Sequence, residues 1–313
     1  MDAEIAYVFC NRQPGESEGS DEFFKLVNSY RVPVIHLSSR LYRKAVHGKR
    51  SRRGVPLPSW RDDFDDEVER AIERGAKLPL PGLRVAGQDG SDLILTQALA
   101  TKKGTQDQDT ALATVGEPAQ RTFSDAPELS GFKVIEALSD SERKPIDFVL
   151  LAGYMLIVTR NLHDKYKMLN LHPALPEGPT GTWQQVIWQL IDQRAHISGA
   201  MIHIATQMLD QGPLVARCIF PLRGPGFDPL WQALGSRTAA EIQSDEGEDH
   251  PLFREIRRHG AIREQPLVLE TLRALALGRV RVEDRRVLDA SSRELAGGLD
   301  LTTEIDAALG NPI

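Results

Sequence analysis

The sequence has little cysteine, no long apolar run and no excess of positive charge. Its two cysteines, Cys10 and Cys218, are far apart and each lies in an apolar run, so we interpret both as reduced core thiols and expect neither a disulfide nor a metal site. No stretch approaches about 18 consecutive apolar residues, and the acidic N-terminus lacks the basic region of a signal peptide. These absences predict a cytoplasmic protein without a membrane partner.

The charge is close to balanced. The 313 residues include 38 Lys and Arg against 44 Asp and Glu, which gives a formal charge of −6, and 41% of the residues are hydrophobic. That apolar share supplies a buried core and excludes a wholly disordered chain. Because phosphate binding normally needs a basic face, the acidity argues against nucleic acid as a partner. A small molecule is the expected ligand.

Apolar runs with strand character alternate with segments of helical period. Strands are predicted at 4–10, 32–37, 146–152, 168–172, 199–205 and 214–220, and helices at 21–30, 161–166 and 182–194. Repeated strand, helix, strand units build a mostly parallel sheet covered by helices on both faces. The sequence therefore predicts the α/β fold class.

The remaining segments are less regular. Residues 40–53 carry a basic cluster, which predicts a solvated loop or else a contact to phosphate. Residues 60–76 predict a surface helix, and residues 78–145, long and poor in apolar periodicity, predict a partly disordered insertion. Beyond residue 221 we expect, in order, an acidic irregular stretch to 249, helices at 251–259 and 264–277, a strand pair at 279–288 and a polar tail.

Three polar side chains lie where predicted strands end. Asn170 and His172 share one face of strand 168–172, which ends at Pro173, and Asp210 lies in the turn after the strand at 199–205. Ligands of α/β sheets gather at strand ends, where an amide donor, a group titrating near neutral pH and a carboxylate are useful together. Each of these residues alone also fits a turn or packing role. His203, in mid-strand, is interpreted as a core histidine.

Four segments around these residues resemble folate-dependent formyltransferases in order and approximate spacing. They are Leu151-Ala-Gly-Tyr-Met155, Leu169-Asn-Leu-His-Pro-Ala-Leu-Pro176, Gly199 to His203, and Leu209-Asp-Gln-Gly-Pro213. Within that superfamily the chain is most similar to the phosphoribosylglycinamide formyltransferase family of purine biosynthesis. The resemblance covers roughly residues 4–37 and 146–222, and more weakly 263–277.

The resemblance implies a Rossmann-like domain at residues 1–222, with the insertion at 78–145, and a C-terminal helical extension at 223–313. It implies that Asn170, His172 and Asp210 are catalytic, and that 10-formyltetrahydrofolate is the cosubstrate that formylates a small amine, phosphoribosylglycinamide or a related one. The reduced folate would be bound by two loops, formed by Tyr154, Met155, Leu156, Ile157, Val158 and by Ala205, Thr206, Gln207, Leu209. For the segment Tyr154 to Val158, plain core packing is an equal alternative.

Three departures from the family concern the acceptor. The family opens with a strand, a Gly-rich loop and a helix that hold the substrate phosphate, and this chain begins after that unit. Met201 stands where a small hydroxyl residue is usual, and the segment Glu177 to Trp183 is different. We therefore expect a different acceptor pocket. A catalytically degenerate binding protein and a formyltetrahydrofolate hydrolase remain alternatives, and the sequence is compatible with a homodimer.

Overall fold

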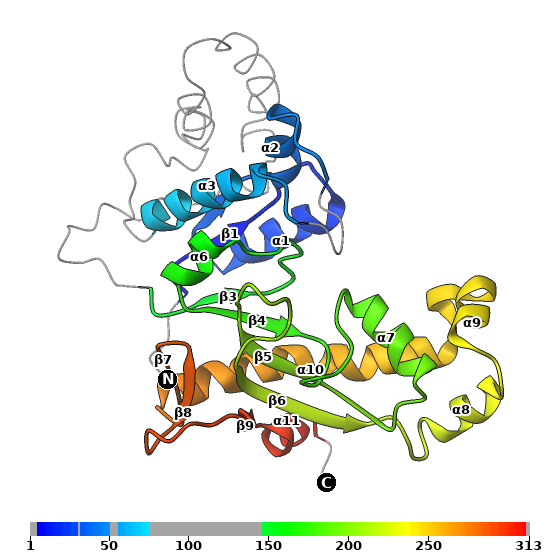
Figure 1. The fold of residues 1–313 in the computed structure, drawn as a ribbon. Helices are drawn as coiled ribbons and strands as arrows, with labels where there is room; N and C mark the ends of the chain where they lie inside the picture. Colours follow the sequence, from blue (N-terminus) through cyan, green and yellow to red (C-terminus); the bar gives the residue numbers. More distant parts are fainter. Residues whose placement is uncertain (1–4, 31, 51–55, 76–145, 311–313) are drawn as a thin grey trace. The chain divides into compact units, whose positions relative to one another are not determined.

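The computed structural model describes residues 5–30, 32–50, 56–75 and 146–310, so the predicted insertion at 78–145 lies outside the described residues (Figure 1). The described residues form two compact units. We call them the N-terminal unit, within residues 4–147, and the C-terminal unit, within residues 148–313. Among the described residues, no helix is long and apolar enough to cross a membrane.

The N-terminal unit contains the predicted strand, helix, strand arrangement. Strands β1 (Val8–Cys10) and β2 (Val34–His36) pair in parallel, and helix α1 (Glu18–Ser29) connects them. Phe24 and Val27 on the buried face of α1 pack against Val34. The helical spacing of apolar residues in this segment thus lets α1 pack on the two parallel strands that it connects.

Two further helices follow, and one of them corrects a prediction. The basic segment expected as a loop at 40–53 begins with helix α2 (Ser39–Ala45); its residues 51–53 lie outside the described part. The side chain of Ser38 caps α2 by accepting from the Leu41 amide, which supplies the start signal that the basic composition obscured. Tyr42 of α2 packs on the rings of Trp60 and Phe64 in the predicted surface helix, α3 (Trp60–Gly75).

The C-terminal unit is built on a five-stranded sheet. Its strand order is β3 (Val149–Leu151), β4 (Met168–His172), β5 (Ile197–Ile204), β6 (Leu214–Pro221) and β9 (Leu299–Asp300). The pairs β3–β4 and β6–β9 are parallel, whereas β4–β5 and β5–β6 are antiparallel. The α/β class is confirmed, and the sheet of this unit is mixed because a short polar turn folds β5 and β6 into a hairpin.

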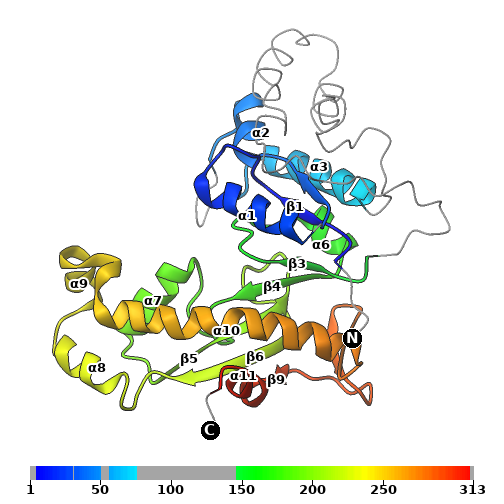
Figure 2. The same cartoon turned by 180° about the vertical axis from the view of Figure 1, so that it is seen from behind.

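Helices and a hairpin surround this sheet. In chain order they are α6 (Arg160–Lys165), α7 (Trp183–Asp192), α8 (Asp228–Leu234), α9 (Ala239–Asp245), the short 3₁₀ helix η4 (Gly247–Asp249), α10 (Pro251–Ala276), the antiparallel pair β7 (Val280–Glu283) and β8 (Arg286–Asp289), and α11 (Thr302–Ala308). Helix α10 lies across one face of the sheet (Figure 2). Leu267 and Ala274 of α10 share a buried cluster with Ala200 and Ile202 of β5.

The stretch predicted to be irregular up to residue 249 contains helices α8 and α9, so that prediction was wrong. In α9 the signal was local: the Thr238 side chain accepts from the Glu241 amide, and the Glu241 carboxylate accepts from the Thr238 amide. The acidic composition hid this capping box. Trp231 and Ile242 then bury the apolar sides of the two helices in a common cluster.

The end of the chain also differs from the prediction. The two helices expected at 251–259 and 264–277 are one helix, α10, which continues through Pro266. Buried Ile256 and Leu267 lie on either side of that proline, so packing on the sheet outweighs the helix-breaking tendency of proline. The expected polar tail contains β9 and α11, with Leu301 and Ile305 fully buried.

The segment predicted as an extension, 223–313, contributes to the same buried clusters as the sheet. Leu252 and Phe253 pack with residues of α7, and Leu301 packs with residues of β5 and β6. The compact units divide near residue 148, not at 222. The division of the chain into a catalytic domain and an extension stays a prediction.

Candidate active site

Strand β4 presents two of the predicted catalytic residues, Asn170 and His172. β4 lies between β3 and β5, with Leu151 and His203 as the strand neighbours of Asn170. Alternation puts the side chains of Asn170 and His172 on the same face of the sheet, and Pro173 follows directly. Backbone pairing on both sides of β4 therefore fixes where these two side chains project.

His203 of β5 lies directly across from Asn170. The Asn170 Nδ2 and His203 Nε2 atoms are 3.1 Å apart, and the His203 Nδ1–H donates to the Ile204 carbonyl at 3.1 Å. Burial lowers the pKa of His203, so its ring is neutral near pH 7. A neutral ring that donates at Nδ1 accepts at Nε2, so His203 receives a hydrogen from Asn170 and orients its amide.

Asp210 completes the cluster from the turn between β5 and β6. Its backbone has a φ of 56°, a left-handed conformation in which Asp and Asn are the tolerated side chains after glycine. The turn closes on β5 because the Ile204 amide donates to the Pro213 carbonyl, at 2.9 Å. A Cβ atom on Gly212 would lie 1.7 Å from the Ile204 carbonyl oxygen, so this close approach requires glycine.

The Asp210 carboxylate faces all three neighbouring side chains. Its Oδ1 atom is 3.5 Å from His172 Nδ1, 3.5 Å from Asn170 Nδ2 and 3.8 Å from His203 Nε2. The side chains of His172 and Asp210 are 3% and 6% exposed. At this depth solvent screens their interaction weakly, so a change of charge on one side chain is felt by the other.

His172 has an acceptor at each ring nitrogen. Its Nε2–H donates to the Pro179 carbonyl at 3.0 Å, while Nδ1 faces Asp210. Both ring nitrogens of His172 therefore face oxygen atoms, which orients the imidazole in the cluster.

The structure thus brings together the three residues predicted to be catalytic and adds His203, which the sequence reasoning interpreted as a core histidine. His203 is indeed buried, but it also contacts Asn170 and Asp210. The contact with Asn170 follows from the antiparallel register of β4 and β5, in which Asn170 and His203 are opposite. The sequence did contain a signal for His203, because this residue lies next to the last residue of β5, directly before the turn that carries Asp210.

The residues predicted to bind the cosubstrate lie on two loops of the C-terminal unit. The first, after β3, turns at Gly153 with a φ of 65° and exposes the side chains of Met155 and Ile157, whereas Val158 is buried. The second follows β5, where Ala205 is buried and Leu209 exposed. The Ala205 amide donates to the Met168 carbonyl of β4, at 2.8 Å. Apolar side chains such as Met155 and Leu209 are thus accessible to a flat aromatic ligand.

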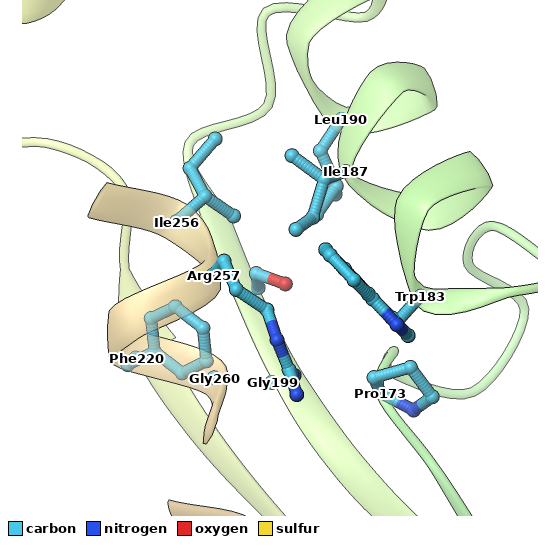
Figure 3. Close-up of a pocket in the computed structure, with 10 residues that line it drawn as sticks. Pro173, Trp183, Ile187, Leu190, Gly199, Phe220, Ile256, Arg257 and Gly260 are labelled. Carbon is cyan, nitrogen blue, oxygen red and sulfur yellow. The ribbon is translucent and has the colours of Figure 1, made fainter. Parts of the chain in front are cut away.

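A small cavity of about 20 Å³ lies between α7 and α10, and Pro173 is one of the residues that line it (Figure 3). Trp183 and Arg257 face each other across it, with the guanidinium carbon 4.6 Å from the indole centroid. Its volume is that of about one water molecule. It therefore does not hold a substrate, and it is separate from the cluster of Asn170, His172, His203 and Asp210.

Among the described residues, no group of three or more His, Cys, Asp or Glu side chains has metal-binding geometry.

The family comparison bears on the region that carries this cluster. Residues 102–222 match the family model described as formyl transferase. The resemblance to formyltransferases is confirmed. The match includes β3, β4, β5 and β6 and therefore all four polar side chains of the cluster. It also includes residues 102–145, which we predicted to belong to an insertion, and it leaves out residues 4–37.

Solved structures similar to the chain include glycinamide ribonucleotide transformylase 1 from Symbiobacterium toebii, with 18% identity, a TM-score of 0.43, and coverage of 91% of this chain and 79% of that one. The phosphoribosylglycinamide formyltransferase of Coxiella burnetii is 16% identical, with a TM-score of 0.44 and coverage of 95% and 85%. A formyltetrahydrofolate deformylase from Pseudomonas syringae is 20% identical, with a TM-score of 0.30 and coverage of 58% and 46%. No curated protein matches the chain.

Proposed function

We propose that the chain transfers the formyl group of 10-formyltetrahydrofolate to a small amine, phosphoribosylglycinamide or a related one. The observation that carries the proposal is the buried cluster of Asn170, His172, His203 and Asp210 within the segment that matches the formyl transferase family. An amide donor, an imidazole and a carboxylate in one cluster are the groups that acyl transfer to an amine needs.

The reaction begins when the amine nitrogen attacks the formyl carbon, which forms a C–N bond and places negative charge on the formyl oxygen. The Nε2–H of His172 would donate to that oxygen in place of the Pro179 carbonyl, and the Asn170 amide hydrogen that faces Asp210 at 3.5 Å would donate as well. One such donor typically lowers the barrier by about 3 kcal/mol.

Collapse of the intermediate breaks the bond between the formyl carbon and N10 of the folate. The attacking amine must lose a proton, and N10 must gain one. Asp210 is the buried base beside His172, so it holds the imidazole in place and can accept the amine proton directly or through water. The same proton, passed on from Asp210, can then go to N10 as the bond to the formyl carbon breaks. His203 keeps the Asn170 amide oriented with its nitrogen toward the cluster.

Water could replace the amine at the same residues, which would make the chain a formyltetrahydrofolate hydrolase. A degenerate chain would bind folate without either reaction. The test is to incubate the purified chain with 10-formyltetrahydrofolate and a panel of amines that includes glycinamide ribonucleotide, with water alone as the control. We expect a formylated amine and tetrahydrofolate. Formate in the water control would indicate the hydrolase, and an unchanged cosubstrate in every reaction would contradict the proposal.

A further inference from the structure

The C-terminal unit contains a second polar cluster, in which one side chain links two elements far apart in the sequence. Arg285, at the tip of the hairpin β7–β8, donates through Nη2 to the carbonyl oxygen of His163, at 3.1 Å, and forms an ion pair with Asp164. Both partners belong to α6. The hairpin and α6 lie at the same end of the sheet in Figures 1 and 2.

The position of α6 in the chain gives this contact its importance. The proposed folate loop, residues 154–158, leads through Thr159 into α6, and α6 is followed directly by β4, which carries Asn170 and His172. A displacement of this one and a half turns of helix therefore moves the proposed folate loop and the start of β4 together.

The hairpin adopts an unfavourable backbone to make the contact. Its two-residue loop, Asp284 and Arg285, has φ values of 47° and 61°. Two successive residues in this conformation are typical of a tight hairpin turn that favours Asn-Gly, because a left-handed backbone is strained when the residue carries a side chain. Glycine would fit better here than arginine, so the fold of the hairpin alone does not account for Arg285.

Asp164 of α6 is paired with one arginine of its own helix and with Arg285 of the hairpin. Asp164 accepts from Arg160 at 2.8 Å and pairs with Arg285, and these two hydrogen bonds lower the pKa of Asp164 to about 2. His163 is buried, with its Nδ1 atom 3.2 Å from Arg285 Nη2. Arg285 thus contacts the side chain of Asp164 and both the backbone and the side chain of His163. An ordinary surface ion pair has only the first of these contacts.

We infer that Arg285 is a positioning residue, which holds α6 so that the loop 154–158 keeps the conformation that binds reduced folate. This inference rests on the proposed function, because it assigns folate to that loop. Arg285 itself lies at the far end of α6 and contacts neither the loop nor the buried cluster in the described structure.

The sharpest variant is Arg285→Gly. It relieves the left-handed backbone and removes the contact, so a purely structural role predicts a change in stability at most, with unchanged binding of the folate. We expect instead that its dissociation constant for tetrahydrofolate, measured by calorimetry, rises about tenfold, which corresponds to about 1.4 kcal/mol. Arg285→Lys retains one charged contact and should recover part of the affinity. Arg286→Ala, which removes the same charge from the exposed neighbouring residue, is the matched control and should bind as the wild type does.

Hydrogen exchange provides a readout without ligand. We expect faster exchange in Arg285→Gly at residues 152–166 than in the wild type or in Arg286→Ala. Wild-type binding of tetrahydrofolate with equal affinities for Arg285→Gly and Arg286→Ala would overturn the inference and leave the proposed function intact. A wild-type chain that does not bind tetrahydrofolate would overturn both, and the exchange rates would then show only whether Arg285 orders α6.

Discussion

Two histidine and aspartate pairs in the C-terminal unit differ in what surrounds the carboxylate. In the first pair, His172 and Asp210, both side chains are buried, and the ion-pair partners of Asp210 within the described residues are histidines. In the second, His163 Nδ1 lies 3.0 Å from Asp164, whose side chain is 40% exposed. Asp164 also pairs with Arg160 and Arg285.

This difference decides what each pair can do. The permanent charges of two guanidinium groups neutralise Asp164 whatever the state of His163, so that pair fixes a helix. Asp210 has no guanidinium partner among the described residues, so its carboxylate faces His172 without competition from a permanent positive charge. The first pair is suited to chemistry and the second to position.

The largest effect should come from the buried pair. His172→Ala removes the imidazole without touching the apolar core, so turnover of 10-formyltetrahydrofolate should fall about 100-fold or more. Steady-state kinetics with the best acceptor of the amine panel measures this. His196→Ala, an exposed histidine before β5, is the control and should turn over at the wild-type rate. Equal rates for both variants would remove His172 from the active site.

A third histidine, His36 of β2, has a pKa that desolvation lowers to about 4. Its ring packs on that of Phe24, with the two ring centroids 5.8 Å apart. Because the unfolded chain binds a proton at about pH 6.5 and the folded chain does not, stability is full above that pH and falls as the pH decreases toward 4. The loss at pH 5 should be about 2 kcal/mol.

Urea unfolding of the wild type and of His36→Phe at pH 7 and pH 5 measures this loss. The substitution keeps a ring beside Phe24 and removes the titrating group. We expect the variant to lose clearly less stability between the two pH values than the wild type. The same pH dependence in both proteins would mean that burial does not hold His36 neutral.

Asp210→Asn should have a smaller effect than His172→Ala. Asparagine tolerates the backbone φ of 56° and keeps the shape of the side chain, so only the charge is lost. We expect kcat to fall about tenfold, because His172 loses its charged partner and water must replace Asp210 as the proton acceptor. Asp164→Asn should instead raise KM for the folate and leave kcat unchanged. A kcat for Asp164→Asn as low as that of Asp210→Asn would break the distinction between the two pairs.

The sequence predicted those features that depend on local order. β4 was predicted with its observed bounds, since Met168 to His172 ends at Pro173, and the hairpin of β5 and β6 was indicated by its polar turn. The acidic composition around residues 239–245 obscures helix α9, although Thr238 and Glu241 form a capping box. In α10, the break expected at 260–263 is absent, because buried Arg263 and Leu267 continue the packed face of the helix.

The candidate active site was predicted in part, because some of its residues are recognisable from local sequence. Asn170, His172 and Asp210 stood out as polar residues at strand ends, and their order matched a known family. The sequence does not indicate the contacts of His203, because they depend on the register of β4 and β5. It does not indicate those of Arg285 either, because its hairpin lies far along the chain from α6, and Arg285 comes 122 residues after His163. Non-local packing of this kind leaves no periodic signal in the sequence.

Binding of tetrahydrofolate to the wild-type chain tests the central claim most directly, since every role assigned to the C-terminal unit requires it. Calorimetry should give a dissociation constant in the micromolar range, near −8 kcal/mol. The His172→Ala variant should keep most of that affinity, because in our account His172 acts on the formyl oxygen and the loops hold the folate. No detectable heat at millimolar tetrahydrofolate, from a chain shown to be folded, would contradict the account.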